Sequence, residues 1–307
     1  EQVSDKLREK IEQAVEELGY IPNRTAGALA SGHSDTVAVL VPSLTDKASS
    51  RFMQSLQQVL NKNEFQLLLG CHEYNQLKEA EILMTLLQGN PAALVIFGSQ
   101  LADKTHQILE KTNIPTINVV GSPFSPAQIT IETAFFEASH KLTEHLLEQG
   151  YKNIGFIGAH MDNRLQRQQL NGWHKAMLSH YQNSDLVITM PDAASLQLGR
   201  YALNEILLRQ PELDAVICSH EEIALGIMFE CQRRLLKIPE NIAVACLDGS
   251  DNCDQTHPTL TSIRIDYKKM GIETGKLLIG LLNNNHDESE ESRIVQFNYQ
   301  IELRQST

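Results

Sequence analysis

The chain has 307 residues, of which 42% are hydrophobic and 21% charged, as expected of an ordinary globular protein. That length is sufficient for two lobes and a small appendage. A net charge of −12 argues against DNA binding over a broad face of the chain as it stands. No apolar run approaches the roughly 18 residues needed to span a bilayer, and no signal peptide opens the sequence, so no membrane partner is expected.

Cysteine usage favours a reducing compartment. The five cysteines are an odd number, without a CxxC pair or a metal-binding Cys/His spacing, so we expect reduced thiols in the cytoplasm. They are Cys71, Cys218, Cys231, Cys246 and Cys253.

Two short segments precede the first strand. Residues 3–18 carry apolar side chains at helical spacing, with Ser4 as a plausible N-cap and Gly19 as the end. Residues 23–31 form either a second short helix capped by Asn23 or an ordinary linker, and both readings stay open. Acidic side chains balance the basic ones throughout residues 1–34, so there is no basic patch.

From Thr36 onward, strands and helices alternate, which predicts parallel βαβ units. We expect strands at 36–42, 65–71, 92–97, 116–120 and near 129, with a helix at about 133–149 closing a first lobe. A second series of strands follows at 153–158, 186–190, 214–219, 242–247 and 260–265. After a helix that begins near Met270, an acidic loop at 283–292 precedes one last strand at 294–302.

Ligands of open α/β sheets bind beyond the carboxyl ends of the strands. With two lobes facing each other, the loops after the strands line one cleft. These loops are 43–45, 71–74, 98–100, 160–167, 220–222 and 248–251.

The sequence lacks the motifs of common catalytic and cofactor sites. It has no Walker A loop, no GxGxxG and no HExxH, and residues 248–254 fall short of a calcium loop. Glu221 and Asp248 could pair as carboxylates, but no nucleophile or metal ligand stands beside them. We therefore expect no enzyme, no cofactor and no metal.

Several segments together resemble the lactose-repressor family of bacterial transcription regulators. They are 17–45, Ala224-Leu-Gly226, Phe229-Glu-Cys-Gln-Arg233 with Leu236-Lys-Ile-Pro239, and His257-Pro-Thr-Leu-Thr-Ser262 with Met270-Gly271. The resemblance spans nearly the whole chain. It implies an α/β fold of two doubly wound parallel-sheet lobes, similar to type I periplasmic binding proteins, with a helical remnant of a helix-turn-helix head.

The resemblance also implies a division of the chain. Residues 1–34 would be a partial DNA-binding head and hinge helix. The N-terminal lobe would comprise 35–151 plus 264–284, and the C-terminal lobe 152–263 plus 285–307.

In the resembled family, two hinge helices meet in the minor groove of operator DNA and a leucine wedges between base steps. That role would fall to Leu29, with Asn23, Arg24 and Ala26 beside it. The family's recognition helix has no counterpart before Glu1, so we expect a truncated or proteolysed repressor that acts as a homodimer.

The family's effector contacts correspond to cleft positions of this chain. The predicted set is Ser43, Thr45, Phe52, Arg164, Arg167, Gln169, His220, Glu221 and Asp248. His220-Glu221 replaces an Asn-Asp pair, and Gln169 replaces an arginine. Trp173 is read as core rather than as a stacking platform, and His220 either contacts the ligand or only caps the following helix.

The resemblance is greatest to gluconate-utilisation repressors, through residues 39–45, 158–164 and 229–233. We therefore expect a ligand-responsive repressor whose effector is a sugar or, as the leading case, a sugar acid. Arg164 and Arg167 would bind the effector's carboxylate. The alternative is a periplasmic-type solute-binding protein, against which the head helix and hinge of residues 1–31 argue.

Overall fold

The computed structural model describes residues 5–19, 34–98, 101–121, 127, 129–159, 164–283 and 293–307. Among them, helix α1 (Asp5–Leu18) confirms the predicted first helix, and Gly19 follows it with a positive φ of 60°. The predicted N-cap Ser4 and the predicted hinge, with Asn23, Arg24, Ala26 and Leu29, lie outside the described residues. No helix in the described part of the chain is long and apolar enough to cross a membrane.

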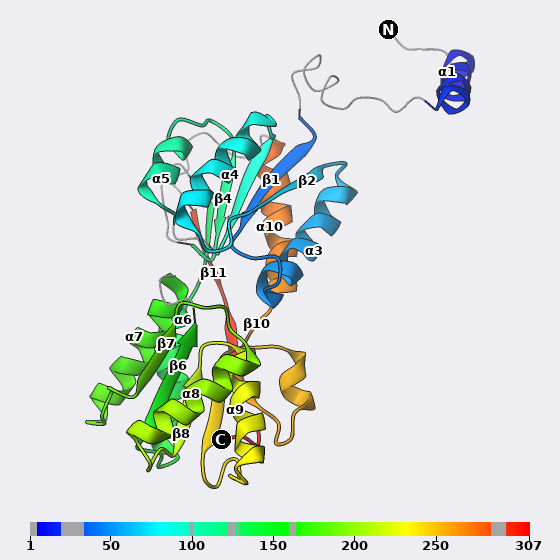
Figure 1. Cartoon of the computed structure of the whole chain (residues 1–307). Coiled ribbons are helices and arrows are strands. Elements are labelled where there is room, and N and C mark those ends of the chain that lie inside the picture. The colour runs from blue at the N-terminus through cyan, green and yellow to red at the C-terminus, as the bar shows by residue number, and fades with distance from the viewer. Residues whose placement is uncertain are drawn as a thin grey trace.

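Two six-stranded sheets form the core of the protein (Figure 1). The first has the order β11-β5-β4-β3-β1-β2, and the second has the order β12-β10-β9-β8-β6-β7. All pairings are parallel except that of β12 with β10. The predicted α/β class with two doubly wound lobes is confirmed.

The first sheet is made of strands whose bounds are β1 (Thr36–Val41), β2 (Gln66–Cys71), β3 (Ala93–Phe97), β4 (Thr116–Val119), β5 (Ile129–Thr133) and β11 (Arg293–Phe297). Successive residues of β1 alternate between its two faces. Val37, Val39 and Val41 pack under helices α3 (Lys47–Lys62) and α10 (Tyr267–Leu282). Ala38 and Leu40 pack on the other face, beneath α4 (Gln76–Gln88) and α5 (Asp103–Leu109). Every residue of β1 after Thr36 is therefore buried, as a central parallel strand requires.

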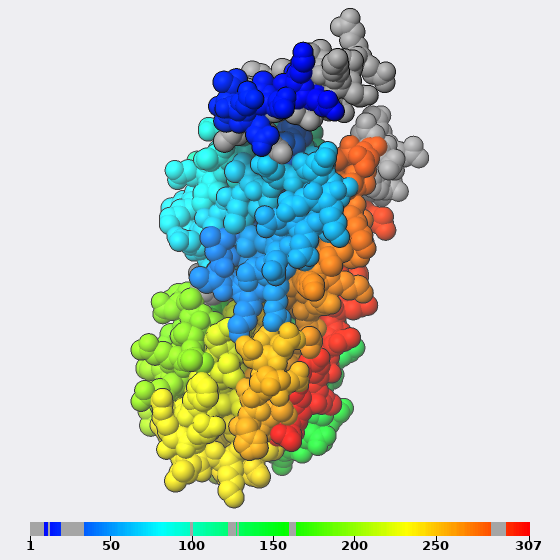
Figure 2. All heavy atoms as spheres, turned by 90° about the vertical axis from the view of Figure 1, so that its right-hand side faces the viewer, coloured from blue at the N-terminus to red at the C-terminus, as the bar shows by residue number. Residues whose placement is uncertain are grey.

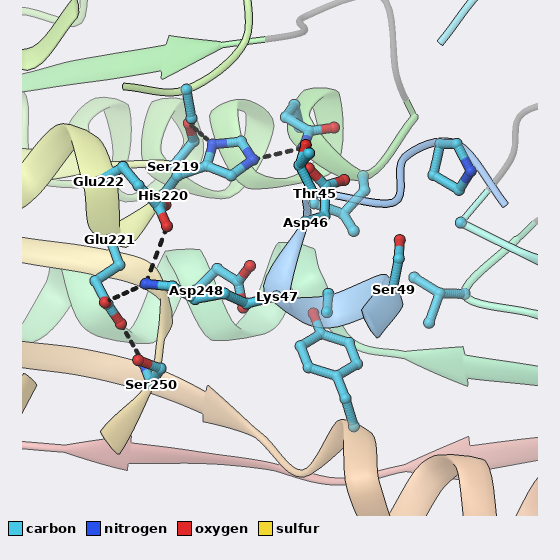
Figure 3. Close-up of a pocket in the computed structure, with 18 of the residues that line it drawn as sticks. Thr45, Asp46, Lys47, Ser49, Ser219, His220, Glu221, Glu222, Asp248 and Ser250 are labelled. Atoms are coloured by element: carbon cyan, nitrogen blue, oxygen red, sulfur yellow. Dashed lines mark hydrogen bonds and ion pairs between the residues drawn. The ribbon is translucent and has the colours of Figure 1, made fainter. Parts of the chain in front are cut away.

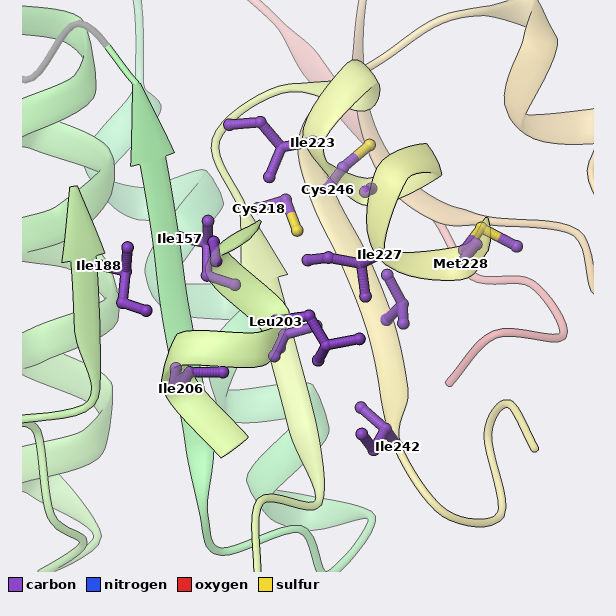
Figure 4. Close-up of a cluster of buried hydrophobic side chains, with 14 of the residues drawn as sticks. Ile157, Ile188, Leu203, Ile206, Cys218, Ile223, Ile227, Met228, Ile242 and Cys246 are labelled. Carbon is purple, nitrogen blue, oxygen red and sulfur yellow. The ribbon is translucent and has the colours of Figure 1, made fainter. Parts of the chain in front are cut away.

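The second sheet is made of β6 (Ile154–Ala159), β7 (Val187–Met190), β8 (Ala215–Cys218), β9 (Ala243–Gly249), β10 (Thr261–Ile265) and β12 (Tyr299–Glu302). Helices α8 (Leu196–Arg209) and α9 (Glu221–Arg233) cover one face, where Ile157, Leu203 and Ile227 join a large apolar cluster (Figure 4). The cluster also takes in Cys218 and Cys246, which serve there as small apolar side chains.

Helices α6 (Phe135–Glu148) and α7 (Arg164–Ser179) cover the opposite face of the second sheet. Residues 133–149 were expected to close the first lobe, and that expectation is wrong. The apolar side of α6 packs with Phe156 and Trp173 of the second lobe. The close approach depends on Gly172, where an added Cβ would lie 2.3 Å from the carbonyl oxygen of Phe136. Trp173 is fully buried, which confirms its prediction as core.

The carboxy-terminal tail also differs from expectation. Residues 294–302 were predicted as one strand of the second lobe, but the segment divides at Asn298. β11 pairs with β5 in the first sheet, and β12 pairs with β10 in the second. Two edges were available, one in each sheet, and the tail satisfies both with its backbone hydrogen bonds.

The chain thus passes between the lobes at Ala134, at Asp266 and at Asn298. Figure 1 shows α10 beside α3 in the upper lobe although 205 residues separate their ends in sequence, from Lys62 to Tyr267. In the space-filling view the blue atoms around α3 lie directly against the yellow and gold atoms of the second lobe (Figure 2). The lobes therefore meet along their facing edges.

Candidate functional site

A cavity of about 250 Å³ lies between the two lobes. Loops after β1, β2, β3, β4, β8 and β9 line it, as the topology of parallel sheets predicts. Of the nine effector positions inferred from the sequence, the structure brings five to this cavity. They are Thr45, Gln169, His220, Glu221 and Asp248.

The other four positions do not line the cavity. Ser43 shapes the turn before α3, where its hydroxyl accepts hydrogen bonds from the N–H groups of Thr45 and Asp46 at 3.1 and 3.3 Å. Phe52 is fully buried and stacks on Phe97, a lining residue, with ring centroids 4.5 Å apart. Phe52 therefore supports the wall from behind.

The two predicted arginines also lie elsewhere. Arg164 donates a hydrogen bond to the Gly121 carbonyl oxygen at 3.1 Å and lines a separate cavity of about 230 Å³. Arg167 is exposed on α7, whereas Gln166 and Gln169 of the same helix are buried and line the main cavity. Helical periodicity turns positions 166 and 169 inward together and leaves 167 outside.

Lys47 links the two lobes across the cavity (Figure 3). Its ammonium, on the first turn of α3, lies 2.6 Å from Glu221 Oε1 and 3.0 Å from Glu222 Oε1, both on the first turn of α9. Burial by itself lowers the pKa of Lys47, but the two carboxylates outweigh burial and raise it above 10.5. Lys47 is not among the site residues predicted from the sequence, although its place directly after the β1 loop could have identified it.

Glu221 is the most enclosed acid of the site, with a side chain 1% exposed. Besides Lys47 it accepts hydrogen bonds from the Ser250 N–H at 2.7 Å and from Asn252 Nδ2 at 3.0 Å. Burial tends to raise the pKa of Glu221, yet the three donors together hold it below 4.5. Glu221 is therefore an ionised carboxylate whose hydrogen-bonding capacity is largely occupied.

Asp248 has the opposite character. Loss of solvation, followed by the charges of Glu222, Glu221 and Asp46, raises its pKa to about 7, although a hydrogen bond from Tyr267 opposes the shift. Asp46 accepts a short hydrogen bond from the Tyr74 hydroxyl. The two tyrosines reach the cavity from α10 and from the loop after β2, so they come from distant parts of the chain.

His220 occupies the N-cap position of α9 without a side-chain capping bond. Its Nδ1 hydrogen-bonds with the Ser219 hydroxyl at 2.7 Å, and its Nε2 lies 3.5 Å from Gln166 Nε2. The imidazole therefore lines the cavity. The capping hydrogen bond, which was the alternative to ligand contact, is not observed.

Four buried polar atoms of the cavity wall have no hydrogen-bond partner among the described residues. They are Ser49 Oγ, Gln166 Oε1, Gln169 Oε1 and Gln169 Nε2. Buried polar groups in folded proteins are almost always paired, by protein, water or ligand. The wall therefore presents both donors and acceptors to whatever fills the cavity, an arrangement suited to a molecule with several hydroxyl groups.

The described residues include no group of three or more His, Cys, Asp or Glu side chains placed to hold a metal ion. Ser219 and His220 are hydrogen-bonded to each other. The chemistry that the arrangement displays is hydrogen bonding by donors and acceptors fixed on two lobes.

Comparison with known proteins identifies relatives along nearly the whole chain. Residues 143–307 match the model of the periplasmic binding protein-like domain. The HTH-type transcriptional regulator GntR of Escherichia coli K12 is 31% identical over 274 residues, which cover 88% of this chain and 81% of the relative.

Solved structures agree with this similarity. A PurR family transcriptional regulator from Vibrio parahaemolyticus is 39% identical and superposes with a TM-score of 0.81, over 88% of this chain and 98% of that one. A LacI family transcriptional regulator from Silicibacter pomeroyi is 26% identical, with a TM-score of 0.80 and the same coverage.

Proposed function

Because the chain belongs to the lactose-repressor (LacI/GalR) family of ligand-responsive transcription regulators, we propose that its interlobe cavity binds a sugar acid such as gluconate. The single observation that carries the proposal is the cavity wall itself. The Ser49 hydroxyl, the Gln166 amide oxygen and the Gln169 amide group have no hydrogen-bond partner among the described residues, while Asp248 and His220 add further polar atoms.

The size and polarity of the cavity agree with a small polyol. A volume of about 250 Å³ lies at the small end of ligand pockets and accommodates a six-carbon chain. The similarity to GntR of Escherichia coli favours a sugar acid over a neutral sugar. Gln169 offers one acceptor and two donors, which matches neighbouring hydroxyl groups.

Binding would act through the angle between the lobes. Since Lys47, Ser49 and Thr45 belong to the first lobe and His220, Glu221 and Asp248 to the second, one ligand touches both. An effector changes operator binding only if it prefers one lobe arrangement over the other. The sign of that preference decides whether it induces or co-represses.

A cytoplasmic homodimer would transmit the change to operator DNA. Exposed apolar side chains favour such a dimer, because a monomer would leave them in water. They include Leu68 and Leu69 on the edge strand β2, Leu77 and Met84 on α4, and Tyr201 and Phe229 on the second lobe.

The experiment is thermal unfolding of this chain with gluconate, ketogluconate, neutral sugars and purines. A ligand at 100 times its dissociation constant stabilises the folded state by about 2.7 kcal/mol. A shift with the sugar acids alone supports the proposal. A shift confined to neutral sugars or purines would discard the sugar acid and leave the family assignment intact.

A further inference from the structure

The first turn of α3 forms one wall of the cavity and has no side-chain cap. Its N-cap residue, Asp46, makes no capping hydrogen bond, because its carboxylate accepts the Tyr74 hydroxyl instead. The Ser43 hydroxyl bonds the N–H groups of Thr45 and Asp46 and the Thr45 hydroxyl, all before the helix begins. Ser50 N–H is the first to close a helical bond, to the Asp46 carbonyl oxygen.

The N–H groups of Lys47, Ala48 and Ser49 are consequently without a hydrogen-bond partner among the described residues. The amino end of a 16-residue helix also carries the positive end of the helix dipole. Helix ends of this kind bind anions when they face a ligand space. A helix end alone is common, however, and would not identify a site.

Ser49 supplies a second observation. Its side chain is 1% exposed, its hydroxyl has no hydrogen-bond partner, and it lines the cavity (Figure 3). Three N–H groups and one hydroxyl of this turn therefore have no hydrogen-bond acceptor among the described residues. An ionised carboxylate on a ligand can accept hydrogen bonds from several donors at once, whereas a ligand hydroxyl group accepts fewer. Unpaired donors on this turn therefore favour a carboxylate over a neutral hydroxyl group.

The acidic side chains around this turn have hydrogen-bond or ion-pair partners within the protein. Lys47 pairs with Glu221 and Glu222, Tyr74 donates a hydrogen bond to Asp46, and Tyr267 donates one to Asp248. Arg51, one helical turn beyond Lys47, lines the same wall and lies 3.5 Å from Asp251, a weak ion pair. Because the charges of Glu221, Glu222 and Asp46 still raise the pKa of Asp248, these carboxylates are only partly compensated, and an anion at this turn depends on direct contacts with the N–H groups and the Ser49 hydroxyl.

We infer that the first turn of α3, through the N–H groups of Ala48 and Ser49 and the Ser49 hydroxyl, holds the carboxylate of an acidic effector. The effector's hydroxyl groups then face Gln166 and Gln169 on the other lobe. This subsite rests on the proposed function and replaces the arginines Arg164 and Arg167, which do not line the cavity.

The test compares gluconate with gluconamide, a neutral molecule with the same hydroxyl chain, by titration calorimetry. Wild-type protein should bind gluconate about 10-fold more tightly, the effect of one charge-assisted contact. Ser49→Asp places a negative charge on the turn, which favours the helix but repels an anion. We expect it to bring the ratio to one or below, with gluconamide affinity changed less than about threefold.

Three variants serve as controls for this comparison. Ser49→Ala should reduce the gluconate preference by a few fold, and Arg164→Ala and Arg167→Ala should each leave it unchanged. The subsite is overturned if Ser49→Asp preserves the preference for gluconate. It is equally overturned if Arg164→Ala or Arg167→Ala abolishes that preference.

Inorganic sulfate separates the subsite from the identity of the effector. If neither sugar probe binds, the sugar-acid proposal fails, and amide resonances of Ala48 and Ser49 are followed in ¹⁵N-labelled protein during a sulfate titration. Saturable shifts in the wild type that disappear in Ser49→Asp support the anion subsite. Unmoved resonances in the wild type reject it.

Discussion

The Lys47 ammonium and the Glu221 carboxylate lie 2.6 Å apart although 174 residues separate them, and they belong to different lobes. The lysine is 42% exposed, whereas the glutamate is 1% exposed. The pair therefore stands at the border of the cavity, with the acid on the protein side and the base on the solvent side. It connects the amino ends of α3 and α9 across the effector space.

Replacing Lys47 should reveal how much free energy it costs to bury the Glu221 carboxylate without a cation beside it. Lys47→Met is expected to lower the free energy of unfolding by about 1–2 kcal/mol at pH 7, less than for a fully buried pair because Lys47 reaches solvent. Urea denaturation measures the change. Lys62→Met, on the exposed end of the same helix, should change it by less than about 0.5 kcal/mol.

The effect should depend on pH. The pKa of Glu221 is depressed below 4.5, so the pair's contribution is present above that value and disappears as pH falls through the folded-state pKa. The raised pKa of Lys47 extends the contribution to alkaline pH beyond 10.5. An equal Lys47→Met effect at pH 3 and pH 7 would contradict the ion pair as its cause.

Asp248 should give the reverse dependence. Because its folded-state pKa is raised from 3.8 to about 7, the folded protein loses stability as pH rises between these values. Asp248→Asn is expected to stabilise the effector-free protein by about 1–3 kcal/mol at pH 8 and by little at pH 4. Melting temperatures of the wild type and the variant at both pH values test this expectation. A stability difference between them that does not change with pH would refute it.

Gln169 combines complete burial with an unpartnered amide. Gln169→Leu removes that amide at similar volume, so it should stabilise the effector-free protein by about 1 kcal/mol and weaken effector binding at least 10-fold. Thermal unfolding with and without gluconate gives both quantities. Gln168→Leu, the neighbouring position outside the main cavity, is the matched control. Loss of stability without loss of binding would show that Gln169 is structural.

Two helical glycines differ in what surrounds them. At Gly172 an added Cβ meets the Phe136 carbonyl oxygen at 2.3 Å, so Gly172→Ala should force α6 and α7 apart and cost more than about 3 kcal/mol. At Gly280, in α10, an added Cβ would have no atom of the described residues outside its own helix backbone within 4 Å. Gly280→Ala should therefore stabilise the protein by about 0.5–1 kcal/mol. Chemical denaturation of both variants tests the contrast.

Much of the fold follows from local pattern. Strands such as β1 and β6 read as continuous apolar runs because both faces of a parallel strand are covered. Helical spacing also predicts that Phe52, Leu56 and Leu60 share one buried face of α3. The loops that surround the cavity follow from the rule that ligands bind beyond the strand ends, and Thr45, His220 and Asp248 lie there as expected.

Tertiary structure alone decided which lobe each crossing segment joins. The apolar side of α6 could have covered either sheet. It packs on the second sheet beside α7, where Gly172 has no Cβ to collide with the α6 backbone. Likewise β11 and β12 are both short and half exposed, so their sequences do not distinguish an edge of one sheet from an edge of the other.

The same holds for the site. The family resemblance identified Gln169 and Glu221 but could not join Glu221 to Lys47, or Asp248 to Tyr267, because each pair meets only after the chain has crossed between the lobes. It also predicted that Arg164 and Arg167 bind the effector, because it does not show which side of α7 faces the cavity. Local periodicity sets which residues form strands, helices and strand-end loops. Long-range packing sets which of those side chains share one cavity.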